Sequence, residues 1–264
     1  MKSIAKLVAL TIVITWPALA FAGRPLTVDD AGTVELKRFQ LEAGYSYEHD
    51  AGCDHSDFPV TLNYGLTPKL QVGVGFGSQL DEREDALGRH TRLADMDDIT
   101  LNAKWNPLSA EHFWADHSLS FTIKVPTASH DKGFGSGETD YDLMYIATKS
   151  LGERFNVDFN VGYTWVGDSR NDRLDDSLHY GLALRWQAVE RVELVGEVFA
   201  DTPITSENDT TVAMNAGVRW EVVDDLVLDA AAGAGLRGDA PDVTATVGLT
   251  WTFGFGSKSD QPQK

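Results

Sequence analysis

Nine charged side chains are the residues of this sequence most able to do chemistry, because they interrupt otherwise apolar stretches at regular spacing. They occupy the polar positions of segments in which apolar and polar residues alternate: Glu42, Lys104, Lys124, Asp158, His179, Arg185, Glu197, Arg219 and Asp229. Charges on one face of such segments would either line a polar pathway and set its selectivity, or pair with each other and seal an interior. Buried charges need partners in both cases, so the pattern alone leaves both interpretations open.

Other kinds of chemistry receive less support. His49, Cys53, Asp54 and His55 form the only cluster of metal-ligand types, and their spacing matches no standard zinc site, so we expect no metal and no cofactor. The glycines of Gly133–Gly137 do not open a helix after a parallel strand, as a phosphate-binding loop would. No histidine is followed two residues later by a serine, the pairing found in outer-membrane phospholipases, and we expect no enzyme.

The elements that position the nine charges are predicted to be β-strands. About twelve segments alternate with period 2 over roughly ten residues each. Leu119–Val125, for example, alternates large apolar residues with serine, threonine and lysine. No segment carries a convincing helical stripe, so we expect an all-β protein.

Three features favour a closed barrel over a soluble sandwich, which would alternate in the same way. Glycine recurs on the polar face although it weakens strands, which indicates crowding inside a small barrel. Connections are long at one end and short at the other, as in outer-membrane barrels; the long ones include Leu80–Asp98, Pro126–Thr139, Val166–Asp176 and Asp201–Thr210. Aromatic residues fall at two rims, as two membrane interfaces require: Trp105, Trp186, Trp220, Trp251 and Phe253 at one, and Tyr45, Tyr47, Tyr141, Tyr163, Trp165 and Tyr180 at the other.

Lipid cannot satisfy an open sheet edge, so a membrane-spanning sheet must close. We therefore expect an all-β, closed antiparallel transmembrane β-barrel of about twelve strands with both termini on the periplasmic side.

Composition agrees with this class of protein. The 264 residues carry 22 Lys+Arg against 40 Asp+Glu, a formal net charge of −18, which argues against nucleic-acid binding. A mean hydropathy of −0.22 excludes a helical membrane protein, and Cys53, as a single cysteine, has no disulfide partner.

The chain divides into four expected parts. Residues 1–22 resemble a secretory signal peptide, with Lys2 and Lys6, a short apolar run and Ala20-Phe21-Ala22; the run is shorter than the ~20 residues of a transmembrane helix. Residues 23–34 are expected to be a periplasmic segment or a plug, for which Arg24, Asp29 and Asp30 are the candidate residues, although a disordered leader is also open. The barrel is expected at 35–253 and a polar tail at 254–264.

Three stretches resemble known outer-membrane proteins. Thr246, Gly248, Trp251 and Phe253 resemble the β-signal by which the insertion machinery recognises barrels, although residues follow the last aromatic here. RPLTVDDAGT (Arg24–Thr33) and GSGETDYDLMYIATKSLG (Gly135–Gly152) resemble the outer-membrane transporter family named for a putative phenol-degradation meta-pathway. The resemblance implies a barrel that passes small, often hydrophobic or aromatic, compounds and carries over no catalytic motif.

The expected function is passive transport of small, hydrophobic or aromatic, molecules across the bacterial outer membrane. Expected partners are membrane lipid, lipopolysaccharide, the insertion machinery and the small-molecule substrate. One alternative is a sealed structural barrel whose acidic outer loops contact lipopolysaccharide or a partner, and another is a soluble periplasmic β-protein. Leu80–Asp98 is strongly acidic, and its carboxylates would suit divalent cations that bridge lipopolysaccharide, although a solvated loop is the simpler account.

Overall fold

The computed structural model describes residues 23–51, 53–84, 90–129, 134, 137–167, 174–205 and 208–254. The expected signal peptide, most of Gly133–Gly137 and the tail beyond Gly254 lie outside the described residues. The strands are β1 (Arg38–Asp50), β2 (Cys53–Asp57), β3 (Val60–Thr67), β4 (Leu70–Phe76), β5 (Ser78–Glu84), β6 (His90–Met96), β7 (Ile99–Leu108), β8 (Asp116–Val125), β9 (Asp140–Leu151), β10 (Phe155–Trp165), β11 (Ser177–Val189), β12 (Val192–Asp201), β13 (Thr211–Val223), β14 (Leu226–Arg237) and β15 (Val243–Gly254).

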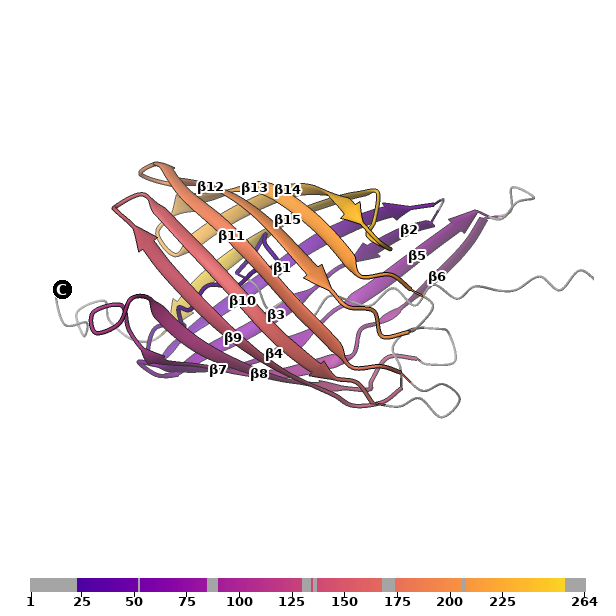
Figure 1. Ribbon diagram of the computed structural model, residues 1–264, viewed down its shortest axis with the longest axis horizontal. Helices are drawn as coiled ribbons and strands as arrows, with labels where there is room; N and C mark the ends of the chain where they lie inside the picture. Colours follow the sequence, from indigo (N-terminus) through magenta and orange to yellow (C-terminus); the bar gives the residue numbers. More distant parts are fainter. Residues whose placement is uncertain are drawn as a thin grey trace, which may run out of the picture.

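The strands form one antiparallel sheet that closes on itself, as Figure 1 shows. Closure is made by β1 and β15, which pair from Arg38 opposite Gly254 to His49 opposite Val243. The short strands β2, β5 and β6 continue β3, β4 and β7 beyond brief interruptions. Each of these pairs is therefore one strand of the barrel, and the expected closed antiparallel barrel of twelve strands is confirmed. The beginning of β1 and the end of β15 lie at the same end of the barrel.

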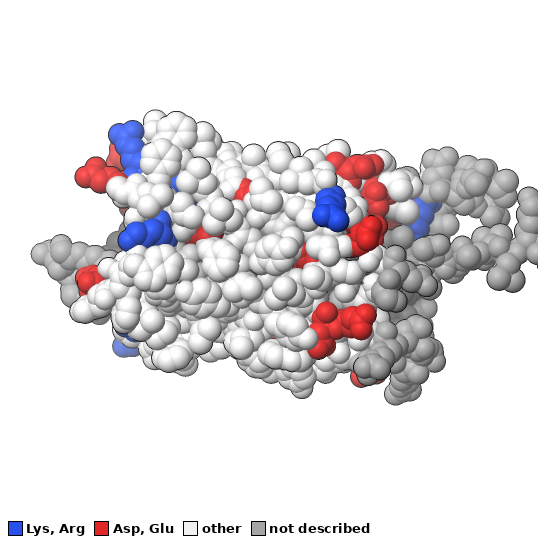
Figure 2. All heavy atoms as spheres, in the orientation of Figure 1, with Lys and Arg blue, Asp and Glu red and all other residues white. Residues whose placement is uncertain are grey.

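Side chains alternate between the two faces of the wall. On β7, Leu101 and Trp105 are 47% and 50% exposed, whereas Asn102 and Lys104 between them are buried. The outer surface is therefore apolar and the inner surface polar, the reverse of a soluble protein. On the face shown in Figure 2, charged side chains gather towards the two ends and leave the middle largely uncharged. Such a band matches the hydrocarbon layer of a bilayer.

Exposed aromatic residues mark both edges of this band. Phe155 and Trp186 stack at 6.0 Å between ring centroids on the rim with short turns, and Trp251 and Phe253 lie 4.5 Å apart on the same rim. Tyr141, Tyr163 and Trp165 are exposed at the opposite rim. No helix among the described residues is long and apolar enough to cross a membrane.

One expectation about the connections is wrong. The sequence predicts a long outer loop at Leu80–Asp98, but most of this stretch forms β5 and β6. The two strands pair with each other, from Ser78 opposite Met96 to Glu84 opposite His90. Together with β2 and the end of β1 they make an extension of the wall at the long-loop end (Figure 1), called the outer extension below. Outside the bilayer a strand needs no apolar face, so a strongly charged sequence can still pair and the period-2 signal is lost.

Candidate functional site

The segment Gly23–Val34, called the lumenal segment below, lies inside the barrel. Leu26, Val28 and Ala31 are 3%, 3% and 0% exposed. The chain leaves the lumen at the short-turn end, where Leu36 bridges Gly65 of β3 before β1 begins. Among the described residues, the lumenal segment joins no strand pair. Side chains of the wall therefore hold it in place.

Two groups of apolar side chains on the inner wall receive the apolar side chains of the segment. Leu26 and Val28 pack against Ala183 of β11 and Val195 of β12, with Phe199 beside them. Ala31 packs against the inward side chains Met144 and Ile146 of β9 in a second cluster. The lumenal segment thus covers two apolar patches, one on the inside of β9 and one on the inside of β11 and β12.

Polar side chains on the same wall bind the backbone of the segment. The Glu197 carboxylate accepts hydrogen bonds from the backbone N–H groups of Thr27 and Val28, the latter at 2.7 Å. The Asn160 side chain accepts from the N–H of Asp29 at 2.7 Å and donates to its carbonyl at 2.8 Å. Each contact satisfies a backbone group that no sheet partner satisfies, as a buried irregular segment requires.

Cations of the wall neutralise the acids of the segment. Lys104 Nζ lies 2.8 Å from the Asp29 carboxylate and donates to the Asp30 carbonyl at 3.0 Å. Arg185 pairs with Asp158 at 2.6 Å and lies 3.9 Å from Asp30. The buried acids of the segment are therefore paired, as burial demands.

Arg24 is held in a niche made by two glycines. Gly44 on β1 and Gly248 on β15 are paired across the closure of the barrel. A Cβ atom at either position would collide with the Arg24 guanidinium. The guanidinium lies 3.3 Å from the Asp229 carboxylate and donates to Thr246 Oγ1 at 2.8 Å. The two glycines therefore leave the space that the side chain of a residue distant in the sequence occupies.

Arg219 fixes the start of the segment. Its guanidinium donates to the Arg24 carbonyl at 2.6 Å and to the Gly23 carbonyl, and it pairs with Glu193 at 3.1 Å. The beginning of the lumenal segment is thus held by charges of β12, β13 and β14.

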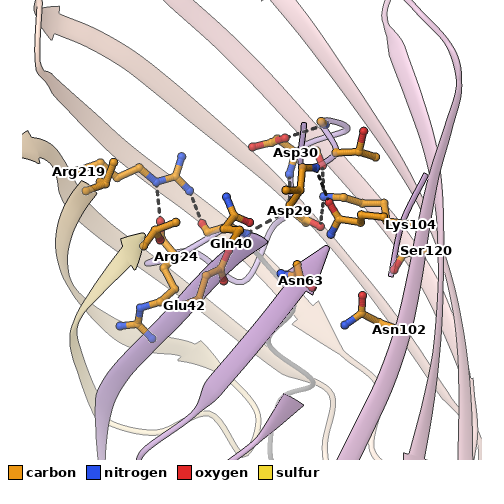
Figure 3. Close-up of a pocket in the computed structure, with 17 residues that line it drawn as sticks. Arg24, Asp29, Asp30, Gln40, Glu42, Asn63, Asn102, Lys104, Ser120 and Arg219 are labelled. Atoms are coloured by element: carbon orange, nitrogen blue, oxygen red, sulfur yellow. Dashed lines mark hydrogen bonds and ion pairs between the residues drawn. The ribbon is translucent and has the colours of Figure 1, made fainter. Parts of the chain in front are cut away.

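A polar cavity of about 260 Å³ remains on the other side of the segment. Figure 3 shows Gln40, Glu42, Asn63, Asn102 and Lys104 around it, with Arg24, Asp29 and Asp30 of the segment closing it. The lumen is therefore not packed shut.

Further charges lie nearer the long-loop end of the lumen. Lys124 pairs with Asp140 at 2.6 Å and with Asp98 at 3.4 Å, and His179 Nε2 lies 2.6 Å from Asp142. These contacts involve no residue of the lumenal segment.

In the outer extension, His55 lies between two carboxylates. Its Nδ1 is 2.5 Å from Asp81 and its Nε2 is 3.0 Å from Asp57. Burial lowers the pKa of His55, but the hydrogen bonds to Asp57 and Asp81 outweigh burial and raise the pKa to about 10. His49 bonds Asp54 at 2.6 Å. Among the described residues, no group of three or more His, Cys, Asp or Glu side chains is arranged to hold a metal ion.

The nine charged candidates fall into three sets. Lys104, Glu197, Arg219 and Asp229 contact the lumenal segment directly, and Arg185 with its partner Asp158 approaches Asp30. Glu42 lines the cavity. Lys124 and His179 lie apart from the segment, in pairs with carboxylates.

Sequence reasoning missed the neutral and apolar members of the site. Asn63, Asn102 and Asn160 alternate with apolar residues as the charges do, so the same pattern marks them as inward-facing. The segment Val192–Ala200 alternates less regularly than the others because inward Val195 and Phe199 are apolar where a polar residue is usual. Apolar residues on both faces of this one strand are therefore the sequence pattern that indicates a segment packed inside the barrel.

Solved structures with the same fold include an outer membrane channel and two porins. An outer membrane channel from Pseudomonas putida F1 is 15% identical with a TM-score of 0.70, covering 85% of this chain and 98% of its own. The NanC porin is 7% identical with a TM-score of 0.55, covering 80% of this chain and 98% of its own. The KdgM porin, solved in complex with disordered oligogalacturonate, is 9% identical with a TM-score of 0.53, covering 80% of this chain and 99% of its own. No curated protein matched the chain.

The sequence itself matches a family model over residues 22–253. The match includes the lumenal segment and the strands of the barrel as far as Phe253 of β15. The chain therefore belongs to the family described as the putative MetA-pathway of phenol degradation.

Proposed function

We propose that this chain is a bacterial outer-membrane channel through which small molecules, hydrophobic or aromatic in part, diffuse passively, and that the lumenal segment is its plug. The observation that carries the proposal is the apolar stripe of Ala183, Val195 and Phe199 beneath Leu26 and Val28. When the segment leaves, this stripe becomes an apolar surface inside an otherwise polar lumen.

The way the segment is held supports a removable plug. Its contacts are side-chain hydrogen bonds, ion pairs and apolar packing, such as those made by Glu197, Lys104 and Arg219. The barrel's own hydrogen bonds run between neighbouring strands and do not depend on the segment. Withdrawal therefore costs local contacts and leaves the wall intact. No catalytic step is proposed.

Planar-bilayer conductance of residues 23–264 tests the proposal. We expect short, rare openings in the intact chain and steady channels after deletion of Arg24–Thr33. Lys104→Ala and Arg219→Ala are expected to change ion selectivity as well, because each removes a cation from the lumen. Arg191→Ala is the matched control, because Arg191 pairs with Asp224 on an exposed turn. Correctly inserted barrels that conduct in neither form would instead support the sealed structural barrel.

Two partner assignments remain part of the proposal. The residues Thr246, Gly248, Trp251 and Phe253 lie on β15, the last strand to close the barrel, where the insertion machinery would meet them. The outer extension carries Asp54, Asp57, Asp81, Glu82 and Asp95 at the long-loop end, where lipopolysaccharide bridged by divalent cations would lie.

A further inference from the structure

We propose that the cavity beside the lumenal segment is a binding subsite for the hydroxyl group of a small neutral molecule, with Asn63 and Asn102 as its hydrogen-bonding partners. The inference deepens the proposed function and rests on it, since it names the chemistry of a molecule held on its way through the lumen. It concerns the polar wall, opposite the apolar stripe.

The cavity has the size of a small organic molecule. Its volume is about 260 Å³, whereas one water occupies roughly 30 Å³ in the liquid. The lumenal segment closes one side through Asp29, Asp30 and Val34, and the inward side chains of β1, β3, β4 and β7 form the other (Figure 3).

Two buried polar atoms in this cavity have no partner. Asn63 is 6% exposed and Asn102 is 8% exposed. Asn63 Oδ1 and Asn102 Nδ2 make no hydrogen bond with any described residue. Most buried polar side-chain atoms in proteins are hydrogen-bonded. An acceptor and a donor left unpaired in one cavity therefore indicate a ligand that supplies both bonds.

The backbone register places the two amides at one level of the wall. Asn63 of β3 is paired with Gly73 of β4, which is paired with Asn102 of β7. A Cβ atom at Gly73 would collide with Asn63 Oδ1 and lie 2.7 Å from Asn102 Nδ2. The glycine thus leaves room for both amide groups beside β4. A hydroxyl group in the adjoining cavity would accept from Asn102 Nδ2 and donate to Asn63 Oδ1.

The charges around the cavity favour a neutral ligand over an anion. Three cations and three carboxylates line the cavity. Lys104 is bound to the Asp29 carboxylate at 2.8 Å, Arg24 pairs with Asp229 at 3.3 Å and Arg219 pairs with Glu193 at 3.1 Å. Each cation is therefore already neutralised, and an anionic ligand would also meet the carboxylate of Glu42, which selects against it.

Binding of benzyl alcohol to the mature chain in lipid nanodiscs tests the inference, with toluene as the analogue that lacks the hydroxyl and benzoate as the anion. Saturable binding is measured by titration calorimetry against empty nanodiscs. We expect saturable binding of benzyl alcohol, weaker binding of toluene and none of benzoate. Asn63→Leu combined with Asn102→Leu should weaken binding of the alcohol at least tenfold, because two neutral hydrogen bonds are lost.

The matched control is Asn156→Leu, an inward asparagine of β10 that binds Ser150 and does not line the cavity. It should bind benzyl alcohol as the unmodified chain does. The double variant should still fold and show the same heat-modifiable migration on a gel, because leucine has nearly the shape of asparagine and removes two unpaired polar groups. A purely structural role for the amides would instead lower its resistance to unfolding.

Absence of saturable alcohol binding, equal binding of toluene, or unchanged binding in the double variant would each overturn the inference. The proposed function is judged separately by conductance. Open channels that bind no alcohol would refute only the subsite, whereas binding to a barrel that never conducts would refute only the channel.

Discussion

Gly44→Ala should release the lumenal segment without weakening the barrel. The added methyl group would occupy the position of the Arg24 guanidinium. Arg24 would then lose its hydrogen bonds to Thr246 Oγ1 and the Val247 carbonyl, both at 2.8 Å, and its contact with Asp229. The strand itself should not suffer, because alanine is less unfavourable than glycine inside a strand.

The size of the effect follows from these contacts. A hydrogen bond that involves a charged group contributes about 1.5–3 kcal/mol. Two short bonds are lost, but the guanidinium is the far end of a flexible side chain and can shift to form part of them again, so roughly half of their sum should remain as a loss. We expect about 1.5–3 kcal/mol less favourable docking of the segment, or roughly a 10- to 150-fold shift towards the undocked state.

Single-channel recording at fixed voltage measures this shift as a higher open probability. Gly196→Ala is the matched control, because a methyl group there would make an ordinary contact of 3.7 Å. In an Arg24→Ala background, Gly44→Ala should have no further effect, since its target is gone. Two results would refute the conclusion that Arg24 in its niche holds the segment in the lumen. One is an open probability that Gly44→Ala does not change, and the other is an equal rise in the unmodified chain and in the Arg24→Ala variant.

Two other predictions concern the outside of the barrel. Leu182→Arg places a charge in the middle of the apolar band, at a side chain that is 55% exposed. It should lower the free energy of unfolding in lipid by about 2–4 kcal/mol, whereas Val223→Arg near a strand end should lower it by about 0–1 kcal/mol. Equal losses would contradict the position of the band. In the folded outer extension the pKa of His55 is raised to about 10, against 6.5 for an ordinary histidine. The ion pairs of His55 with Asp57 and Asp81 therefore stabilise the extension fully below pH 6.5. This stabilisation declines as the pH rises and is lost above about pH 10. Pulse proteolysis of the extension should therefore separate wild type from His55→Gln most strongly at pH 6 and least near pH 10, and a difference that grows with pH would disprove the assignment.

The class of fold was within reach of the sequence because alternation is a local property. Period 2 along Leu119–Val125 specifies both a strand and its two faces, and the hydrocarbon layer then requires closure. The alternation does not reveal the strands within Leu80–Asp98. Strands that pair outside the bilayer need no apolar face, so their apolar and polar residues do not alternate.

The sequence by itself determined which residues lie on the apolar face of each strand and which on the polar face, and it predicted the nine charges on the polar face. Their partners were decided only by the tertiary structure. Arg24 reaches Asp229 and the niche of Gly44 and Gly248 only because closure brings β1 and β15 together. Leu26 meets Val195 only because the segment folds back into the barrel. Charge pairing and internal packing depend on distances between residues far apart in the chain, and no local pattern encodes those distances.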